Sequence, residues 1–401
     1  MMRRVVLTGA GTVNALAHDV PGTLAALAQG RSGIGPLAFR DVERLSVRIG
    51  AQVRDWPGLP GMTPREAALW DPFTRFALAA ADEAVAMAGL AAADLAGAGA
   101  ILGTAAGGIS TWEDNYRAVL AEGKDRVPPL VVPRLMHNAA PSHVSIRHGL
   151  RGPTFAVASA CASSNHAIGL AFQMVRSGQA DVMLAGGAEA MLCFGGIKAW
   201  EGLRVLSPDA CRPFDAARNG MVMGEGAAVF VLEEAGHATA RGARALAEVA
   251  GFGMTADAGD IVSPSVEGAE AAMRAALADA RMASGDLGYV NAHGTGTLAN
   301  DRTECAALRA VLGATAGRVA VGSTKGAHGH VIGATGAVEL LACILALRDG
   351  IVPPTAGCTA PAADCGLDIV TGTARAAPIG AALSNSFAFG GLNAVLALRA
   401  A

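Results

Sequence analysis

One cysteine and two histidines occupy positions from which they could act together on a substrate. Cys161, His293 and His330 each follow closely on a short run of small and β-branched residues that predicts a strand. Because the carboxyl ends of parallel strands meet along one edge of a sheet, the three side chains are expected to cluster there. A thiol beside imidazoles is typical of nucleophilic catalysis, in which the sulfur forms a covalent intermediate.

The segment around Cys161 predicts a strand, a sharp turn and a helix. The strand is Phe155–Ser159 and the helix is Ala162–Ser177. A cysteine at this turn lies at the helix N-terminus, where free backbone N–H groups and the helix dipole favour the thiolate. A lone cysteine is more often a buried structural residue, so this segment alone leaves both interpretations open.

Two further segments favour the catalytic interpretation. Tyr289–Thr297 places His293 at the end of a strand, where a Gly/Thr-rich loop begins, and Gly322–Glu339 places His330 at a second strand-to-helix turn. One such histidine could be structural or lie on the surface. Two histidines at strand ends, with a cysteine at a third, fit a catalytic cluster better.

The elements that must position these residues alternate along the chain in the manner of an α/β fold. Two stretches, Phe73–Met87 and Ala162–Ser177, predict helices with wide apolar faces. Beside the strand before Cys161, the expected strands are Arg4–Thr8, Ala100–Gly103, Val182–Gly186, Ala228–Leu232, Ala247–Gly251, Tyr289–Ala292, Val319–Gly322, Ala381–Ser384 and Ala394–Leu398.

The two halves of the chain resemble each other. In each half a helix follows a candidate catalytic turn and leads to a polar turn and a strand, and each half closes with a similar run, Gly226–Leu232 or Asn393–Leu398. This pattern predicts a duplicated α/β unit with a boundary near Ala235–Arg244. We expect an N-terminal half at 1–240 that carries the cysteine and a C-terminal half at 241–401 that carries both histidines.

Two stretches could be mistaken for targeting or membrane segments. The first apolar run breaks at Thr8–Gly11, too soon for a signal peptide, and predicts a strand followed by a turn. Val331–Leu347 contains Glu339 and several glycines and is shorter than the ~20 apolar residues of a membrane span. A buried helix is expected there.

Composition excludes several classes of protein. The chain has 401 residues, of which 52% are hydrophobic and 16% charged, and its net charge of −3 favours neither nucleic acid nor an anionic membrane as a partner. Seven cysteines without a Cys-x-x-Cys pair argue against a disulfide framework and a zinc site, and favour the cytoplasm. A surface with so little charge is compatible with a large subunit interface.

Together these motifs resemble the β-ketoacyl-acyl carrier protein synthase family, in particular its type II elongating enzymes. The resemblance runs from Val5–Gly9 to Asn385–Asn393. It implies the thiolase fold, with two duplicated α/β halves in an αβαβα layering. Segments such as Trp200–Arg204 and Phe387–Asn393 resemble the nodulation protein E-like branch.

The resemblance implies a role for each matching position. Cys161 matches the acyl-accepting nucleophile, and His293 and His330 match the histidines that assist decarboxylation and stabilise the enolate. Lys325 and Glu339 match a charged pair that positions those histidines. The other matches are the phosphopantetheine-binding Thr295 and Thr297, the gating Phe389, the acyl-tunnel residues Ala106 and Trp200, and the carrier-docking Arg65 and Arg204.

Nearby residues of the same types are expected to have other roles. In the family motif the catalytic histidine comes immediately after a glycine, which here is Gly329, so His328 is expected to be a loop residue. His166 is expected to pack or cap within its helix. Asp301 and Glu304 match acidic positions that fix the shape of a loop. Core filling is expected for Cys193, Cys211, Cys305, Cys343, Cys358 and Cys365.

The implied reaction is the decarboxylative Claisen condensation of an acyl thioester with malonyl-acyl carrier protein. The substrates are carried on phosphopantetheine, and neither a metal nor a redox cofactor is implied. The implied partners are an acyl carrier protein and a second subunit, in a homodimer or in a heterodimer with a nucleophile-lacking paralogue.

Two other members of this fold remain as alternatives. A chain-length factor would lack the nucleophile that Cys161 supplies, and a thiolase would carry a late cysteine where this chain has Phe389–Asn393. The chain also departs from housekeeping enzymes. It has Ala388 and Leu392 in the closing loop, and 67–69 lacks the basic residues that usually follow the position of Arg65.

Overall fold

The central sheet contains the same strand arrangement twice. In the computed structural model, which describes residues 2–401, the first half orders its strands β1-β7-β6-β4-β5 and the second β8-β15-β14-β9-β10, with β12 at the outer edge. The strands are β1 (Val5–Asn14), β4 (Gly99–Gly103), β5 (Thr154–Val157), β6 (Val182–Glu189), β7 (Gly226–Glu234), β8 (Ala247–Ala256), β9 (Tyr289–Asn291), β10 (Ala320–Gly322), β12 (Asp368–Ile369), β14 (Ala381–Ala388) and β15 (Leu392–Arg399).

Strand directions repeat with the order. β4 runs parallel to β5 and β6, as β9 runs parallel to β10 and β14. The remaining neighbours in each half are antiparallel, and antiparallel pairing of β1 with β8 joins the halves. The predicted duplication is therefore confirmed, while its exact division at residue 240 stays a prediction.

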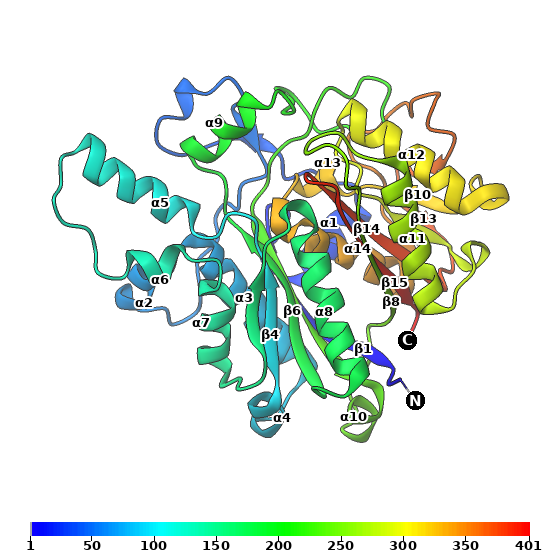
Figure 1. The fold of residues 1–401 in the computed structure, drawn as a ribbon, viewed down its shortest axis with the longest axis horizontal. Coiled ribbons are helices and arrows are strands. Elements are labelled where there is room, and N and C mark those ends of the chain that lie inside the picture. The colour runs from blue at the N-terminus through cyan, green and yellow to red at the C-terminus, as the bar shows by residue number, and fades with distance from the viewer. Residues whose placement is uncertain (1) are drawn as a thin grey trace.

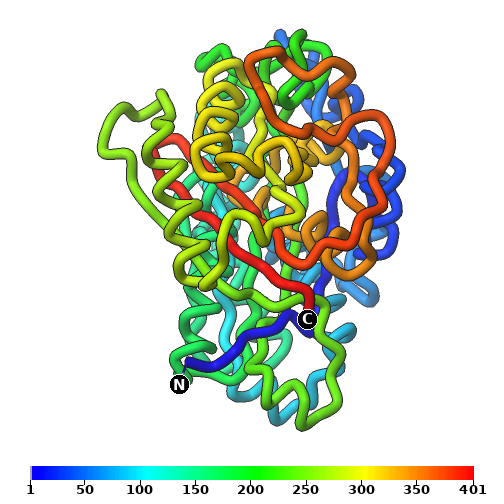
Figure 2. Tube along the Cα trace, turned by 90° about the vertical axis from the view of Figure 1, so that its right-hand side faces the viewer, coloured from blue at the N-terminus to red at the C-terminus, as the bar shows by residue number. Residues whose placement is uncertain are grey.

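Helices cover the outer face of each half of the sheet and fill the space between the two halves (Figure 1). α3 (Pro72–Ala88) packs on β1 and β7, and α11 (Val266–Ala280) packs on β8 and β15. Between the halves, α8 (Ser163–Ser177) and α14 (Thr335–Asp349) touch each other and contact strands of both. The result is the αβαβα layering. Figures 1 and 2 place both chain ends at the same end of the molecule.

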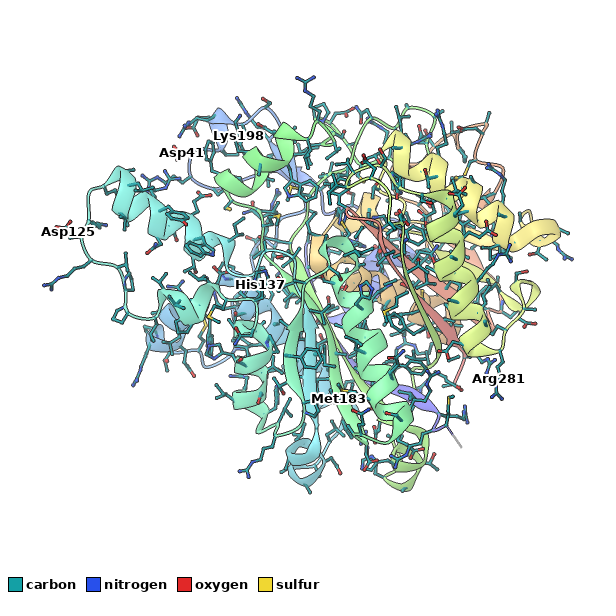
Figure 3. All side chains as sticks on the ribbon, in the orientation of Figure 1. Asp41, Asp125, His137, Met183, Lys198 and Arg281 are labelled. Atoms are coloured by element: carbon teal, nitrogen blue, oxygen red, sulfur yellow. The ribbon has the colours of Figure 1, made fainter. Side chains whose placement is uncertain are left out.

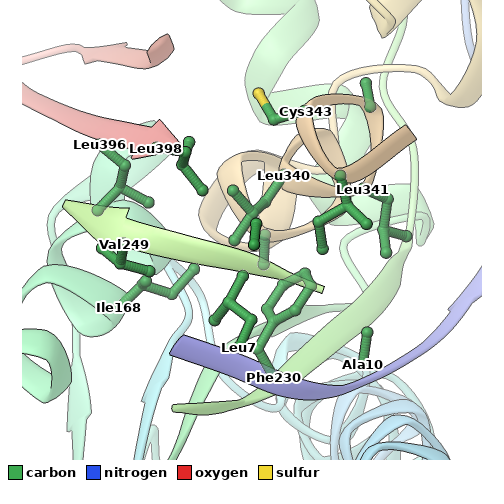
Figure 4. Packing of buried hydrophobic residues seen from close by; sticks show 14 of the residues in the cluster. Leu7, Ala10, Ile168, Phe230, Val249, Leu340, Leu341, Cys343, Leu396 and Leu398 are labelled. Atoms are coloured by element: carbon green, nitrogen blue, oxygen red, sulfur yellow. The ribbon is translucent and has the colours of Figure 1, made fainter. Parts of the chain in front are cut away.

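The two central helices approach closely because small residues face each other. A side chain at Gly336 of α14 would place its Cβ 2.3 Å from the Asn165 amide oxygen of α8. Leu340 and Leu341 of α14 pack with Ile168 of α8 and with apolar residues of β1, β7, β8 and β15 (Figure 4). Residues 335–347 of α14 are all buried, as expected for this apolar stretch. No helix within residues 2–401 is long and apolar enough to cross a membrane.

The first strand differs from the prediction. β1 continues through Thr8–Gly11, where a turn was expected. A Cβ at Gly9 would lie 2.1 Å from the Ala84 carbonyl oxygen of α3, and one at Gly11 would lie 2.0 Å from that of Ala80. These glycines therefore permit close packing of helix on strand rather than a change of chain direction.

One segment projects from the body of the first half. It contains α5 (Ile109–Tyr116) and α6 (Val131–Leu135), and Asp125 lies at its outer end (Figure 3). Large apolar side chains are exposed along it: Trp112, Tyr116, Val119, Leu120, Val127, Leu130, Val132 and Met136.

The remaining elements connect these layers. The helices are α1 (Val20–Ala28), α2 (Pro64–Leu69), α4 (Ala92–Gly97), α7 (Ala139–His148), α9 (Phe194–Gly202), α10 (Ala235–Ala240), α12 (Leu298–Leu312) and α13 (Lys325–His328), and the short strands are β2 (Gly35–Pro36), β3 (Ile49–Gly50), β11 (Ile351–Val352) and β13 (Arg375–Ala376).

Candidate active site

The duplicated fold brings Cys161, His293 and His330 together. Cys161 precedes α8 and His330 precedes α14, so the N-terminal ends of the two central helices meet at the site. His330 Nε2 lies 3.1 Å from the Cys161 sulfur, and the two imidazole rings are 5.4 Å apart. All three side chains are buried. The expected cluster is present.

Cys161 sits on a strained turn between β5 and α8. The preceding Ala160 has φ +48, a left-handed conformation that is uncommon for a residue with a side chain. The Ser163 hydroxyl fixes this turn, since its oxygen accepts from the Ser159 N–H at 2.8 Å and it donates to the Ala160 carbonyl at 2.7 Å. The sulfur is thereby held at the junction of strand and helix.

Burial acts against the thiolate form of Cys161 that its position at a helix N-terminus favours. Burial raises its pKa to about 12. The positive charge of Lys325 and the backbone N–H groups of Cys161 and Phe389 oppose this rise. Those N–H groups point to the sulfur, so they also lie where an oxyanion hole is needed.

The backbone fixes which nitrogen of His330 carries the proton. Its Nδ1 accepts the N–H of Ile332 at 3.0 Å, so the proton of the neutral ring must be on Nε2, which faces the Cys161 sulfur. Burial, then the charge of Lys325, holds the pKa of His330 well below its usual value. His330 is therefore a neutral N–H donor toward the Cys161 sulfur.

His293 is held through its backbone and leaves its ring free. Glu304 accepts the N–H of His293 and that of Gly294, both at 2.7 Å, while the Lys325 ammonium donates to the His293 carbonyl. The buried Nδ1 of His293 has no partner in the structure. Burial lowers the pKa of this imidazole too, so it is neutral.

Lys325 and Glu339 form a fully buried ion pair beside the histidines. The ammonium lies 2.6 Å from a Glu339 oxygen, and neither side chain is exposed. Burial raises the pKa of Glu339 to about 7, and Lys325 opposes this rise. Since the ammonium also holds the His293 carbonyl, the pair is placed to position that histidine.

The two neighbouring histidines lie outside the cluster. His328 is not the loop residue that was expected: it ends α13 and is buried, with Nε2 2.8 Å from the Thr324 hydroxyl and Nδ1 2.7 Å from the Gly329 carbonyl. Both ring nitrogens are therefore occupied. His166 packs in α8, with Nδ1 2.8 Å from the Ser159 hydroxyl and its ring edge toward Phe252.

A cavity of ≈ 120 Å³ opens onto the cluster. Thr295 and Thr297 line it, with their hydroxyl oxygens 2.9 Å apart. Trp200 and Phe389 also line it, and their rings stack with centroids 5.8 Å apart. Ala106 does not line this cavity; it packs in an apolar cluster that includes Ile332 and Trp200.

The two arginines predicted to dock a carrier protein lie apart. Arg204 is exposed and precedes Val205, which lines the cavity. Arg65 is exposed on α2, which lies below the projecting segment in Figure 1, far from α9 at the top of the view. Within one chain, only Arg204 is brought close to the cavity.

Cysteine and histidine are also zinc ligands, and the three side chains of the cluster are close enough to hold a metal ion. The ligand atoms of Cys161, His293 and His330 lie within 4.8 Å of one another. The absence of a metal requirement therefore stays a prediction.

Glu189 is a site residue that the sequence analysis did not find. It is fully buried at the end of β6 and accepts from the N–H groups of Ala105 at 2.7 Å, Ala106 at 3.3 Å and Gly333 at 3.1 Å, and from the Thr104 hydroxyl at 3.0 Å. It thus ties the loop after β4 to the turn after His330. Its signal was an acidic residue at the end of an otherwise apolar strand.

Glu189→Gln is expected to lower the free energy of unfolding by about 2–4 kcal/mol, because the amide NH2 would face two backbone donors in a buried site. Burial raises the pKa of Glu189 to about 7, but every partner is a donor, which suits the carboxylate. Denaturant unfolding measures the change. Glu270→Gln on the surface of α11 is the control, and an equal effect of both substitutions would contradict the account.

The arrangement of Cys161, the two histidines and the buried ion pair on two duplicated α/β halves is the one expected for a condensing enzyme of the thiolase fold. Family models agree: residues 2–238 match "Beta-ketoacyl synthase, N-terminal domain" and residues 246–359 match "Beta-ketoacyl synthase, C-terminal domain". The chain belongs to the β-ketoacyl synthase family.

Relatives place it more finely. It is 47% identical to Nodulation protein E of Rhizobium sp. (strain N33), over 100% of both chains. It is 41% identical to 3-oxoacyl-[acyl-carrier-protein] synthase 2 of Rhizobium meliloti (strain 1021), over 99% of both. These relatives confirm the resemblance to the synthase II-like, nodulation protein E-like branch.

Solved structures share the whole fold. The ishigamide ketosynthase/chain length factor superposes with a TM-score of 0.94 at 34% identity, over 100% of both chains. A type II PKS acyl-carrier protein in complex with its ketosynthase bound to the hexaketide gives 0.92 at 28% identity, again over 100% of both.

Proposed function

We propose that this chain joins an acyl primer to malonyl-acyl carrier protein by decarboxylative Claisen condensation, giving a 3-oxoacyl-acyl carrier protein. The observation that carries the proposal is the approach of the His330 Nε2–H to the Cys161 sulfur at 3.1 Å, with the unpartnered ring of His293 beside it. A nucleophile and two donors face one small cavity.

The first step transfers the acyl group to Cys161. The sulfur attacks the carbonyl of the primer thioester, the thiol proton passes to the departing phosphopantetheine thiol, and an acyl-cysteine forms. The N–H groups of Cys161 and Phe389 are placed to stabilise the negative oxygen of the tetrahedral intermediate. These donors offset the cost of charging the buried sulfur.

The second step forms the carbon–carbon bond. Loss of CO2 from the malonyl thioester leaves negative charge on the thioester oxygen, which the N–H donors of His293 and His330 stabilise. Neutral imidazoles suit this role, and the lowered pKa values keep both rings neutral near pH 7. The enolate carbon then attacks the acyl-cysteine and releases the Cys161 sulfur as a thiolate, which takes up one proton from water to restore the thiol.

Thr295 and Thr297 are proposed to hold the phosphopantetheine arm, and no metal or redox cofactor enters either step. The carrier protein is proposed to dock near Arg204. The names of the synthase 2 relative and of the carrier–ketosynthase complex support a carrier-bound substrate. We also propose that the enzyme works in the cytoplasm. The boundary between its N-terminal and C-terminal halves is proposed to lie near residue 240.

The other members of the fold are less well supported. A chain-length factor lacks the nucleophile, whereas this chain holds Cys161 on a strained turn beside a histidine N–H donor. A thiolase would need a second cysteine in the loop that contains Phe389, and this loop has none.

A direct test supplies the enzyme with malonyl carrier protein and acyl carrier primers of increasing length, and measures product masses. The proposal expects one CO2 lost and two carbons added for each turnover. Release of CO2 without a longer acyl chain would contradict it.

We propose a homodimer, because two features of the first half are left without a partner. Within residues 2–401 the outer edge of β5 pairs with no strand, and the projecting segment exposes eight large apolar side chains. Such an edge and patch are typical of an interface between subunits. Light scattering at micromolar concentration is expected to give twice the chain mass.

An active monomer would contradict this assembly. A monomer that gains activity only with a nucleophile-lacking paralogue would instead favour a heterodimer. Leu120→Glu, at a side chain 78% exposed on the projecting segment, should weaken the dimer. Ile261→Glu, at a residue 72% exposed between β8 and α11 of the second half, is the matched control.

Ala106→Ile is expected to reduce turnover of long primers selectively. Ala106 and Trp200 pack in one apolar cluster. We propose that the acyl chain extends from the cavity past Trp200, so that a larger side chain at 106 would narrow its path. Each methylene of the primer that can no longer be buried would weaken binding by ~0.8 kcal/mol, which lowers the affinity roughly fourfold per carbon. Turnover across a primer ladder measures it, and a uniform change at all lengths would exclude Ala106 as the gate.

A further inference from the structure

Two cysteines outside the catalytic cluster lie in contact. Cys305 of α12 and Cys365, in the turn before β12, are 60 positions apart in the sequence, yet their sulfur atoms are 2.7 Å apart. Both are free thiols and both are buried. No step of the condensation uses them.

The turn that carries Cys365 is fastened to its surroundings. Arg309, one turn of α12 beyond Cys305, donates to the carbonyl oxygens of Asp364 and Cys365. The Cys365 N–H donates to the Ala362 carbonyl at 2.9 Å, and Ala362 N–H donates to the Phe214 carbonyl at 2.8 Å. The two sulfurs therefore meet without any rearrangement of the chain.

The two thiols are not equivalent. The hydrogen bond that it shares with Cys305 lowers the pKa of Cys365, and the guanidinium groups of Arg309 and Arg218 lower it further. Cys305 has no such support, and its pKa is raised. Cys365 is thus the sulfur that carries thiolate character, with Cys305 placed to react with it.

The pair is close to the surface. Both cysteines line a narrow hollow whose rim includes Arg302 and Asp364, and these rim side chains are 73% and 53% exposed. The hollow itself has no room for a water-sized molecule, so a peroxide reaches the sulfurs when the exposed side chains at its rim move aside.

We propose that Cys305 and Cys365 form a redox-active dithiol that hydrogen peroxide converts reversibly to a disulfide. The Cys365 sulfur attacks one peroxide oxygen, the O–O bond breaks, and a sulfenic acid and one water form. The Cys305 sulfur then attacks the sulfenyl sulfur and releases the second water. Two thiols and one peroxide give one disulfide and two waters.

The bond would join parts of the chain that shape the active site. α12 carries Asp301 and Glu304, which accept the backbone N–H groups of Gly296 and of His293 and Gly294. Because the sulfurs already touch, the bond is expected to fasten α12 in place and to leave the catalytic groups where they are.

Peptide mapping of the full-length enzyme tests the proposal. After peroxide treatment and alkylation of remaining thiols, trypsin should release residues 303–309 joined to 349–375, two hydrogens lighter than the separate peptides together. Dithiothreitol should separate them. A cross-link across 60 positions is expected to raise the melting temperature by about 5 °C, reversibly.

Substitutions distinguish the cysteines. Cys358 is on the same tryptic peptide as Cys365, so Cys358→Ser is the matched control and should keep the linked peptides and the thermal shift. Cys365→Ser should lose both. Cys305→Ser should leave Cys365 without its partner, so that peroxide carries it on to the sulfinic acid.

Three results would overturn the proposal. One is that peroxide leaves both thiols free for alkylation after unfolding. Another is that the linked peptides disappear in Cys358→Ser. The third is oxidation of Cys365 to the sulfinic acid in the wild-type enzyme without any link to Cys305.

Discussion

Replacing Cys161 with serine is expected to lower condensation by on the order of 10⁴-fold or more, the range seen when a catalytic nucleophile is lost. A serine hydroxyl is a far weaker nucleophile at neutral pH than sulfur, and His330, whose Nε2 lies against this position, does not remove its proton. His330 faces it with an N–H, because Nδ1 is occupied by the Ile332 N–H. Steady-state turnover and the melting temperature measure activity and folding separately.

Substitution of other cysteines controls for this result. Cys343 is buried in α14, where serine would place a hydroxyl in an apolar layer, and Cys193 is buried before α9. Each substitution is expected to cost about 1–3 kcal/mol of stability and to change turnover little in the folded fraction. Unchanged turnover in Cys161→Ser would refute the proposed function.

Removal of either catalytic histidine is expected to cut condensation on the order of 10²–10³-fold, as loss of one oxyanion donor does. His293→Ala and His330→Ala each remove one of the two donors that face the cavity. The acyl-enzyme should still form in His293→Ala, because the sulfur keeps its contacts with His330 and with the backbone N–H groups. Pre-steady-state acylation and overall turnover separate the two effects.

His328→Ala is the matched control for the histidines. Because both ring nitrogens of His328 are occupied by Thr324 and Gly329, the loss should appear mainly in the melting temperature. Turnover per folded enzyme should fall far less than in the other two variants. Turnover lost in His328→Ala and retained in His330→Ala would reverse the assignment.

The clustering of Cys161, His293 and His330 could be predicted because each residue stands in a recognisable local sequence pattern. A cysteine and two histidines each follow a strand, and a repeated order of elements implies that the strand ends converge. The duplicated sheet explains why this inference succeeds: Cys161 and His330 precede equivalent helices, α8 and α14, whose N-terminal ends meet.

What could not be predicted depends on contacts between segments distant in sequence. Gly9 and Gly11 look like turn residues, but the carbonyls of α3 against them determine their role. His328 is buried by packing of α13, which its sequence neighbours do not reveal. The role of Glu189 depends on the fold, because its carboxylate accepts backbone N–H groups from both the loop after β4 and the turn before α14.

The pKa of the Cys161 thiol could not be predicted from the sequence for the same reason. Its position before a helix favours the thiolate, and that contribution is local. Burial among residues from both halves opposes it and raises the pKa to about 12. The outcome therefore depends on how deeply the fold encloses the sulfur.

The most direct test of the central claim is the mass of the enzyme after incubation with an acyl carrier primer alone. The account predicts that the intact protein gains one acyl group and that the peptide containing Cys161 carries it as a hydroxylamine-sensitive thioester. Addition of malonyl carrier protein should then remove that group as the extended product appears. Extended product made by an enzyme that never carries an acyl group on Cys161 would contradict the account.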